Sequence, residues 1–523
     1  MDNEEEATIQ EHEAEAAISS EAMPRNDGDT VPEAGSSFED PFEIQERLGV
    51  VSLTIITFYG VSGGPFGVEE TVRSAGSFYT LLGFIVMPLI WSLQEALMTA
   101  ELSAAFPEPS GGVAWVQKAF GDRMGWMTGY LSWVSGATDN AIYPVLFVDY
   151  VMQLSGGSTD DIGQFTKFLV FSSISCVLAY TNWLGLPVVG KMSMTICLVA
   201  MSPFIILCIV GAFQVDPSRW FTPPDNANSD QNGEDSGHAT LFSFATWGAI
   251  SWRPYLNNLF WNLNSFDSTS CFAAEVEDPG RTLPRALGWS VVMVALGYIL
   301  PLLVALGASN AKQSDWVDGY FSVIAEEIAG RWLAGWLVFA AGISNIALFQ
   351  AELSSDAFQL MGMAEKGYLP KIFAVRSRHG TPTYSLAVGT IIIICMSVTN
   401  LDQLIEMLNF NYSISLLFEY VAFLKLRISH PHIHRPYKIP LSTAGCFVLF
   451  TPTIVATLVV MMLASLQTIM FSAVVNGLGF LLFSVRENEV CHKYARVNDE
   501  QTEEEDIDLG ELVATSASTG ELG

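Results

Sequence analysis

Long apolar stretches recur along this 523-residue chain, and they constrain its fold more than any other feature. A helix of about twenty apolar residues is long enough to cross the hydrocarbon core of a bilayer. Half of the residues are hydrophobic and only 15% are charged, a balance too apolar for a soluble protein of this length. We therefore predict an all-α membrane protein with twelve transmembrane helices, near residues 48–75, 78–104, 121–153, 166–182, 188–214, 252–274, 286–308, 332–362, 383–400, 403–426, 437–464 and 466–486.

The lysines and arginines between these stretches indicate how the chain is oriented. Segments on the cytoplasmic side of a membrane carry an excess of Lys and Arg. With both termini in the cytoplasm, 17 of these residues fall on the inner side and six on the outer side. This distribution predicts a multi-pass protein of the lipid bilayer with both termini cytoplasmic. We expect it in the plasma membrane, with an internal membrane left open as the alternative.

Most of the formal net charge of −31 lies in two terminal tails. Residues 1–47 contain 15 Asp and Glu against two Arg, and residues 487–523 contain 11 against one Lys and one Arg. Acidic segments with few aromatic residues bury too little apolar surface to become ordered, so both tails are predicted to be disordered. Their sign of charge disfavours a nucleic-acid partner.

The first and sixth predicted spans are interrupted near their middles. Span one contains "FYGVSGGPFGVEE" at 58–70, and span six contains "WNLNSFDSTS" at 261–270. Irregular backbone at membrane depth is expected only where protein buries it or water reaches it. Two breaks that lie five spans apart predict two copies of a five-helix unit with a substrate cavity between the broken helices.

Acidic residues inside the predicted spans have almost no basic partners. They are Glu95 and Glu101 in span two, Asp139 in span three, Asp267 and Glu275 in span six, Glu352 and Asp356 in span eight, and Glu406 and Glu419 in span ten. Ionisable groups at this depth are costly and usually face a cavity or a partner. Unpaired anions there indicate a cationic ligand or bound protons.

Depth divides these carboxylates into two groups. The first group lies near the predicted inner ends of the spans and comprises Glu101, Glu275, Asp356 and Glu419. We favour a structural role for it, in which each carboxylate caps a helix or pairs with Arg123, Arg281, Lys366 or Lys425. For the deeper group we predict ligand contact, and this group is Asp139, Asp267 and Glu352. Glu95 is open between the two roles and is also a candidate proton carrier.

Neighbouring polar and aromatic residues complete a predicted site for a small cation. Carboxylates beside aromatic rings form a common environment for an alkylammonium group. The predicted substrate-binding residues are Ser62, Gly63, Gly64, Asp139, Tyr143, Trp261, Asn262, Asn264, Phe266, Asp267 and Glu352, and the predicted proton carriers are Glu95, Asp267 and Glu352. In this hypothesis the carboxylates and the amide oxygens bind the ammonium ends of the cation, and the aromatic rings cover its methylene groups. Backbone carbonyls near Ser62, which the helix break leaves without helical hydrogen bonds, accept further hydrogen bonds from the ligand.

Several motifs make the chain resemble a known family. The resemblance rests on "VSGGPFGVEETV", "WSLQEALMTAELSAAFPEPSGG", "ATDNAIYPVLFVDY", "LFWNLNSFDSTS", "AEVEDPGRTLPRAL", "AELSSDAFQLMGMAEKGYLP" and "RPYKIP". These segments resemble polyamine uptake transporters of plants and protists, which belong to the amino acid, polyamine and organocation (APC) transporter superfamily, close to its L-type amino acid transporter branch. The resemblance covers essentially all of 48–440 and implies proton-coupled import of putrescine, spermidine or spermine by symport and alternating access.

The resemblance also implies a domain organisation. The fold would be a five-plus-five inverted repeat of the leucine-transporter type, with helices 1 and 6 unwound at mid-membrane and two additional C-terminal helices. Its parts would be a cytoplasmic tail (1–47), the first repeat with helices 1–5 (48–214), an acidic outer loop (215–251), the second repeat with helices 6–10 (252–427), helices 11–12 (428–486) and the second cytoplasmic tail (487–523).

Two departures from related transporters bear on substrate and coupling. In the amino-acid branch a Gly-Ser-Gly turn in span one holds the substrate carboxylate, and the turn here reads Val61-Ser62-Gly63. An amino-acid exchanger is not expected to need the deep carboxylates Asp139, Asp267 and Glu352. Related proton-coupled members carry a lysine midway along span five, whereas Lys191 lies at its inner start. A carboxylate is therefore the expected proton carrier.

Other functions are weighed against this hypothesis. The main alternative is an L-type neutral or cationic amino acid transporter or exchanger, which would move leucine or phenylalanine without responding to voltage. An enzyme is not expected, since no Gly-x-Gly-Asp turn of an intramembrane aspartyl protease precedes Asp139 or Asp267. The seven cysteines show no metal-ligand spacing, so neither a metal nor a cofactor is expected. A homo-oligomer and an accessory subunit both remain open.

Overall fold

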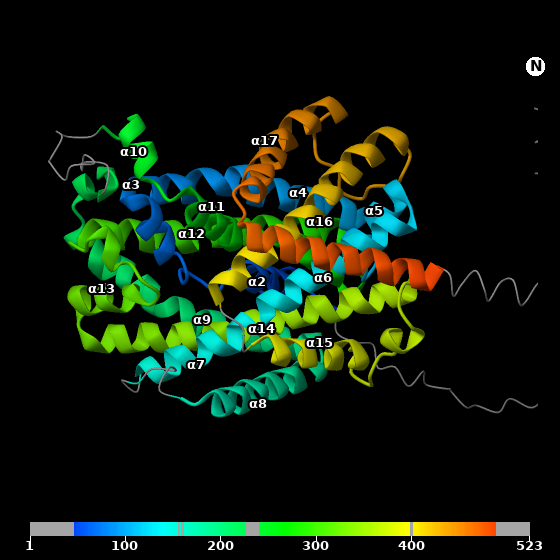
Figure 1. Ribbon diagram of the computed structural model, residues 1–523, viewed down its shortest axis with the longest axis horizontal. Helices are drawn as coiled ribbons and strands as arrows, with labels where there is room; N and C mark the ends of the chain where they lie inside the picture. The colour runs from blue at the N-terminus through cyan, green and yellow to red at the C-terminus, as the bar shows by residue number, and fades with distance from the viewer. Residues whose placement is uncertain (1–46, 155–156, 158–161, 226–239, 398–400, 488–523) are drawn as a thin grey trace, which may run out of the picture. The chain divides into compact units, whose positions relative to one another are not determined.

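The computed structural model describes residues 47–154, 157, 162–225, 240–397 and 401–487, and nearly all of them form helices (Figure 1). In chain order the helices are α2 (Val50–Val61), α3 (Glu69–Met87), η1 (Pro88–Ser92), α4 (Leu93–Ala105), α5 (Gly112–Phe120), α6 (Asp122–Asn140), α7 (Ile142–Leu154), α8 (Gln164–Trp183), α9 (Leu186–Gly211), η3 (Ala212–Gln214), η4 (Pro217–Phe221), α10 (Phe244–Ala249), α11 (Trp252–Leu263), η6 (Phe266–Glu275), α12 (Pro279–Ala308), η7 (Gln313–Asp315), α13 (Tyr320–Ala329), α14 (Arg331–Glu365), η8 (Lys371–Ala374), α15 (Thr383–Met396), α16 (Leu401–Ser429) and α17 (Thr443–Met462). A last helix, Leu466–Glu487, follows α17. Nearly all of both acidic tails, and residues 226–239 of the predicted outer loop, lie outside the described residues.

Six helices of the described chain are long and apolar enough to cross a membrane. They are Glu69–Ala105, Leu186–Gln214, Pro279–Ala308, Arg331–Glu365, Thr443–Met462 and Leu466–Glu487. Two shorter apolar helices are Val50–Val61 and Thr383–Met396. The chain is thus a helical, multi-pass membrane protein, while the count of twelve spans and the inverted repeat stay predictions.

The first predicted break separates α2 from α3. Helix α2 ends at Val61, and residues 62–68 are not helical before α3 begins at Glu69. Gly64 has φ of +104° and Gly67 has φ of +75°, backbone conformations that residues with a Cβ rarely adopt. The glycines of this segment therefore permit the break that the sequence predicted.

Gly76 ends the short helical turn that follows this break. Its φ of +75° and ψ of 177° interrupt α3, so residues 69–75 form a separate short helix before the long apolar helix that leads to α4. A Cβ added at Gly76 would lie 3.2 Å from Cα of Pro224. Residues 69–75 therefore lie within the predicted span 48–75, and the kink at Gly76 lies between this span and the predicted span 78–104.

The second predicted break separates α11 from η6. Helix α11 ends at Leu263, Asn264 is extended, and Ser265 adopts a left-handed conformation with φ of +75°. The chain then continues as the 3₁₀-helix η6. Both predicted interruptions are therefore observed as helix breaks, while their depth in a membrane stays a prediction.

Hydrogen bonds tie the two broken helices together on both sides of the breaks. The hydroxyl groups of Thr57 on α2 and Thr269 on η6 are 2.8 Å apart. Beyond the breaks, Thr71 Oγ1 on α3 donates to Asn258 Oδ1 on α11 at 2.5 Å, and Asn258 Nδ2 donates to the Gly67 carbonyl at 2.7 Å. The unwound segments are therefore held beside each other by side chains from the matching helix.

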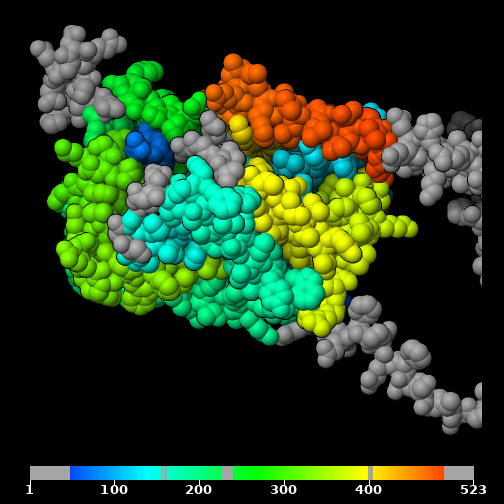
Figure 2. Space-filling view, turned by 60° about the horizontal axis from the view of Figure 1, so that its bottom comes forward, coloured from blue at the N-terminus to red at the C-terminus, as the bar shows by residue number. Residues whose placement is uncertain are grey.

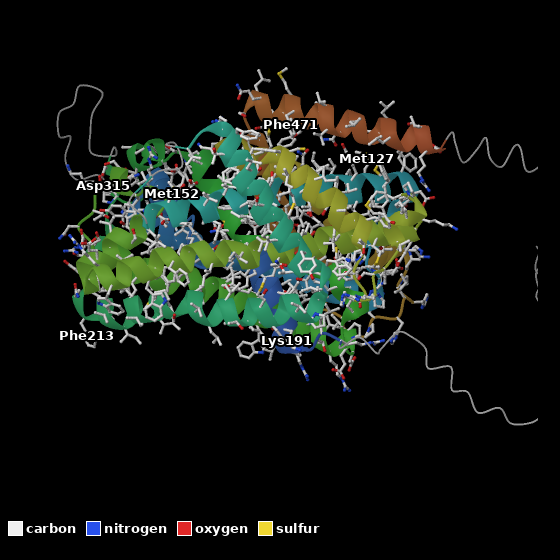
Figure 3. The ribbon with its side chains drawn as sticks, turned by 90° about the horizontal axis from the view of Figure 1, so that it is seen from below. Met127, Met152, Lys191, Phe213, Asp315 and Phe471 are labelled. Atoms are coloured by element: carbon white, nitrogen blue, oxygen red, sulfur yellow. The ribbon has the colours of Figure 1, made fainter. Side chains whose placement is uncertain are left out.

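The long helix α14 lies at the centre of the packing. It contacts α7, α9, α6, α15 and α2, and Figure 1 shows it beside α7 and α15. The neighbouring helix α9 continues directly into η3, and Lys191 and Phe213, labelled in Figure 3, lie near its two ends. The orange-to-red surface of α17 and Leu466–Glu487 forms one edge in Figure 2. The last helix also bonds to α6, since Trp126 Nε1 donates to the Gly479 carbonyl at 2.9 Å.

Ion pairs connect the segments near the start of α2 and near the ends of α4 and α16. Leu48 and Val276 form an isolated bridge, and Glu275 beside it pairs with Arg376 Nη1 at 2.6 Å. The fully buried Glu101 pairs with Arg427 and, at 3.1 Å, with Arg435. The structural role predicted for Glu101 and Glu275 therefore fits, but the partners predicted for them were wrong, since each pairs with an arginine that the sequence interpretation did not consider.

Candidate functional site

A cavity of about 890 Å³, called here the large cavity, lies between the two broken helices. Its wall is formed by the break after α2, by α7, by α11 and by α14. At one end it is lined by exposed side chains such as Arg253, and by Glu70 and Arg73, which are 38% and 54% exposed. At the other end its lining residues are buried or half-buried. The cavity therefore runs from a solvent-accessible mouth to a buried floor.

Asp139 forms the floor of the large cavity together with two aromatic residues. Its Oδ2 accepts a hydrogen bond from the Tyr143 hydroxyl at 2.5 Å, and its Oδ1 accepts one from Trp261 Nε1 at 2.9 Å. Tyr143 is only 4% exposed. Both carboxyl oxygens of Asp139 therefore accept hydrogen bonds, and these two bonds fix the orientation of the group at the base of the cavity.

A second, smaller space of about 30 Å³, called here the small pocket, lies behind this floor. Asp139, Trp261 and Ser265 line both spaces, so they form the partition between them. Five carboxyl-bearing residues line the small pocket, namely Asp139, Asp267, Glu352, Asp356 and Glu419. None of the described residues that line it is Lys, Arg or His. The pocket therefore combines high acidity with room for about one water-sized group.

Glu352 and Asp356 reach the small pocket from one face of α14. Residues four apart lie on the same side of a helix, which brings these two carboxylates together. Opposite them on α6 is Gly136, where an added Cβ would lie 2.7 Å from Glu352 Oε1 and would also collide with Asp356 Oδ1. Within the described part of the chain, neither carboxylate forms a hydrogen bond or an ion pair.

Glu95, Tyr412 and Asp267 form a buried chain of hydrogen bonds beside the small pocket. Glu95 Oε1 on α4 accepts from the Asp267 backbone N–H at 3.0 Å, and the Tyr412 oxygen lies 3.0 Å from the same atom. Tyr412 also contacts Asp267 Oδ1. A hydroxyl has one proton to donate, so a proton on one of the carboxyl groups would allow both contacts to be full hydrogen bonds. The arrangement is suited to storing a proton.

The structure brings together nine of the predicted substrate-binding residues. Six line the large cavity, namely Ser62, Gly63, Asp139, Tyr143, Trp261 and Asn262, and five line the small pocket, namely Asp139, Trp261, Asn264, Asp267 and Glu352. Gly64 and the fully buried Phe266 line neither space. Glu95, predicted as a proton carrier, also lines neither but contacts Asp267.

Two of the predicted binding groups already have partners. The side-chain oxygen of Asn262 accepts from the Tyr298 hydroxyl at 2.8 Å, and the Gly63 carbonyl accepts from Ser344 Oγ. These oxygens hold the broken helices against α12 and α14. They are therefore less available to a ligand than the carboxylates of the small pocket.

Sequence reasoning missed three residues of this region. It gave Asp356 and Glu419 a structural role near helix ends, whereas both line the small pocket and neither belongs to an ion pair of the described residues. It did not consider Tyr412. The available signals were helical spacing, since Asp356 follows Glu352 by four residues and Glu419 follows Tyr412 by seven.

Metal binding is not indicated by this geometry. Across the residues that the structure describes, no group of three or more His, Cys, Asp or Glu could hold a metal ion.

Known proteins provide an independent comparison. The family model described as "Amino acid permease" matches residues 48–481. A probable polyamine transporter of Arabidopsis thaliana is 40% identical over 458 residues, which cover 87% of this chain and 90% of that protein. The polyamine transporter PUT1 of Oryza sativa subsp. japonica is 39% identical over 439 residues, 83% of this chain and 77% of that protein. The polyamine transporter RMV1 of Arabidopsis thaliana is 37% identical, with 84% of each chain covered.

Proposed function

The chain belongs to the amino acid permease family and is therefore a transporter rather than an enzyme, and from this premise we propose that it imports polyamines. The substrates would be putrescine, spermidine and spermine, taken up by proton symport through alternating access. The relatives named as polyamine transporters support this substrate class, because they match the chain over most of its length at about 40% identity.

The observation that carries the proposal is a buried set of carboxylates without basic partners, next to aromatic rings. At the floor of the large cavity Asp139 is held by Tyr143 and Trp261, and behind it Glu352 has no hydrogen-bond partner in the described chain. Buried charges are normally paired, so unpaired anions at a cavity are suited to a cationic ligand. Aromatic faces nearby add a favourable surface for an alkylammonium chain.

In the proposed bound state, carboxylates hold the ammonium ends of an extended polyamine. Asp139, Asp267 and Glu352 supply the charge, and the ring of Trp261 covers methylene groups at the partition. The large cavity, of about 890 Å³, has room for the rest of the chain. Binding between two broken helices would also let the substrate bias which side of the protein is open.

The membrane arrangement behind this mechanism belongs to the proposal. It comprises twelve spans, a five-plus-five inverted repeat with two additional helices, both termini in the cytoplasm and a place in the plasma membrane. The mouth at Glu70 and Arg253 would then face outward, and the ion-paired end at Glu101 would face the cytoplasm. The structure is consistent with an outward-open form, since its large cavity reaches the surface at the first of these ends.

Substrate charge would supply much of the driving force. A negative-inside potential of 100 mV favours entry of each positive charge by about 2.3 kcal/mol, so a trivalent amine gains about 7 kcal/mol. Proton entry would add to this. The buried group formed by Glu95, Tyr412 and Asp267 is the proposed proton carrier, because its two carboxyl groups share the Tyr412 hydroxyl and a bound proton would complete their hydrogen bonds.

Uptake into vesicles tests the proposal. Proteoliposomes with wild-type protein should accumulate labelled spermidine, more strongly with an inward proton gradient and a negative interior. Asp267→Asn and Glu352→Gln should reduce the affinity for spermidine about 10- to 100-fold, since each removes a charge-assisted contact. Glu326→Gln, in an exposed ion pair with Arg331, serves as the matched control.

The amino-acid alternative gives a different result in the same experiment. It predicts uptake of leucine or phenylalanine that ignores voltage, and no accumulation of spermidine. Unchanged spermidine affinity in both charge variants, with normal amounts of protein in the membrane, would refute the assignment of the binding residues.

A further inference from the structure

One face of α4 carries polar side chains that have no role in the site described above. After Glu95, which belongs to the proposed proton carrier, Thr99 and Ser103 follow at intervals of four residues. We propose that their hydroxyl groups, with polar groups of α5 and α16, form an exit path for the proton, from Glu95 to the end of α4 that would face the cytoplasm. This inference rests on the proposed function and extends it to the route by which the coupled proton leaves.

The polar atoms on this face of α4 are buried and unsatisfied. Thr99 and Ser103 are fully buried, and their hydroxyl groups have no hydrogen-bond partner among the described residues. A serine or threonine inside a helix can bond its hydroxyl to the carbonyl four residues earlier, as Thr128 of α6 does to Met124 at 3.0 Å. The two hydroxyl groups of α4 do not, and Glu95 Oε2 also lacks a partner in the described chain. Three groups on one face of the helix therefore need partners from outside it.

Two contacts hold α16 alongside this part of α4. The Tyr412 oxygen lies 3.0 Å from Glu95 Oε1, and Arg427 pairs with Glu101, which is six residues further along α4. Both helices continue without a break between these contacts. The stretch 413–426 of α16 therefore runs beside the polar face of α4.

Polar atoms on α16 and α5 are unsatisfied in the same region. Glu419 and Tyr420 are 2% and 0% exposed, and Glu419 Oε2 and the Tyr420 hydroxyl have no hydrogen-bond partner in the described part of the chain. A Cβ added at Gly112 would collide with Glu419, which places the start of α5 beside it. Trp115, one turn further along α5, is fully buried, and its Nε1 likewise has no partner among the described residues. Unsatisfied polar atoms therefore gather here from three helices.

Water molecules between these atoms would complete a continuous row. Buried polar atoms in native proteins are rarely left without partners, and buried waters often supply them. Residues four apart on a helix are separated by about 6 Å along its axis, and a water molecule hydrogen-bonds to oxygens at about 2.8 Å on either side. One water therefore spans each step from Glu95 to Thr99 and from Thr99 to Ser103.

Proton transfer along this row conserves the protons of the protein. A proton bound to the Glu95–Asp267 pair passes to a neighbouring water, and each hydroxyl then accepts one proton on its oxygen and donates its own to the next water. Ser103 lies four residues before Pro107, which is exposed. Glu101 takes no part, because two arginines hold it. The proton would therefore reach solvent where α4 ends.

Net uptake and exchange of spermidine in proteoliposomes separate proton release from substrate binding. Net uptake requires the transporter to release its proton inside before it returns, whereas exchange of labelled for unlabelled spermidine proceeds with the proton still bound. Thr99→Val and Ser103→Ala each remove one hydroxyl with little change of shape. Each should slow net uptake driven by an inward proton gradient about 5- to 10-fold, the effect of one lost hydrogen bond, while exchange and the KM for spermidine stay at wild-type values.

Matched variants separate the hydroxyl groups from helix packing. Thr128→Val removes an equally buried hydroxyl that is bonded to its own helix, and it should leave net uptake unchanged. Thr99→Ser keeps the hydroxyl and should preserve the wild-type rate of net uptake. Tyr420→Phe removes only the hydroxyl on α16 and should slow net uptake at least threefold without changing exchange. If the variants of α4 do not reach the membrane, Tyr420→Phe decides the question.

The outcomes separate the two proposals. Wild-type protein that takes up no spermidine, or whose uptake ignores the proton gradient, would refute the proposed function, and the exit path with it. Gradient-driven uptake in wild type that is undiminished in Thr99→Val, Ser103→Ala and Tyr420→Phe would refute the exit path alone. Equal losses of net uptake and exchange would also refute it, because a general structural effect slows both.

Discussion

Two sets of buried carboxylates in this molecule have the same chemistry and opposite surroundings. Glu101, at one end of the helices, is fully buried and pairs with Arg427 and Arg435. Glu352 and Glu419, near the helix breaks, are 8% and 2% exposed and belong to no ion pair of the described residues. The first set joins α4 to α16 and to the segment that follows it, whereas the second set surrounds a pocket.

The difference shows how a membrane protein separates stability from function. Burying a charge is tolerated when a partner compensates it, and removing one partner is then strongly destabilising. A buried charge without a partner lowers stability unless a ligand or proton supplies the compensation. Stability should therefore depend on the paired set, and ligand binding on the unpaired set, which the following changes test.

Replacing Glu101 should have the largest effect. Glu101→Gln leaves two buried arginines uncompensated, so we expect the free energy of unfolding to fall by about 3–5 kcal/mol. Thermal unfolding of the purified protein in detergent measures this. Glu352→Gln is the comparison from the unpaired set, and it should leave stability unchanged or higher because it removes like-charge repulsion. Equal losses in both variants would contradict the division into two sets.

Asp139 has an intermediate character, since two aromatic side chains donate hydrogen bonds to it but no cationic side chain of the described residues pairs with it. Asp139→Asn should reduce the affinity for spermidine about 10- to 100-fold through the loss of the charge. Tyr143→Phe removes only the hydroxyl that donates to Asp139 and should cost about 1 kcal/mol, less than tenfold in affinity. Labelled uptake gives both values. A larger loss in Tyr143→Phe than in Asp139→Asn would show that the tyrosine hydroxyl, not the carboxylate, recognises the substrate.

Much of this contrast could be predicted from the sequence. The glycines around Gly64 and the polar run at 261–270 identified both helix breaks, because each pattern is incompatible with a continuous apolar helix. Helical spacing placed Asp139 next to Tyr143, and the structure joins them by a hydrogen bond. Local patterns therefore predicted the breaks and the floor of the cavity.

Partners distant in the sequence could not be predicted in the same way. Glu101 and Arg427 are 326 residues apart, and nothing in either segment indicates that they meet. Glu419 was assigned a structural role because it lies near the end of a predicted span, but its surroundings depend on α5 and α14. Gly112 and Gly136 gave no signal, since the space they leave matters only through carboxylates on other helices.

Tyr412 provides a smaller test, of coupling rather than binding. Tyr412→Phe removes the hydroxyl shared by Glu95 and Asp267, which should cost about 1 kcal/mol of stability. Uptake driven by membrane potential should persist, while the added accumulation produced by an inward proton gradient should decrease. Uptake into vesicles, with the membrane potential and the pH gradient imposed separately, distinguishes these two driving forces. An unaltered response to the proton gradient would exclude this hydroxyl from coupling.

The smallest effect is expected at the mouth of the large cavity. Glu70 lies 3.8 Å from Arg73, and both side chains are substantially exposed, so their ion pair contributes at most about 1 kcal/mol. Glu70→Gln should change the affinity for spermidine less than about fivefold. A reduction as large as that of Glu352→Gln would show that substrate recognition extends to the mouth.

Thermal unfolding with and without spermidine tests the central claim most directly. If the unpaired carboxylates are a binding site for a cation, spermidine at 100 times its dissociation constant should stabilise the wild-type protein by about 2.7 kcal/mol. The Glu352→Gln variant should be at least as stable as wild type without ligand and should lose most of the stabilisation by spermidine. No stabilisation of the wild-type protein by spermidine, or the same stabilisation in wild type and Glu352→Gln, would contradict the account.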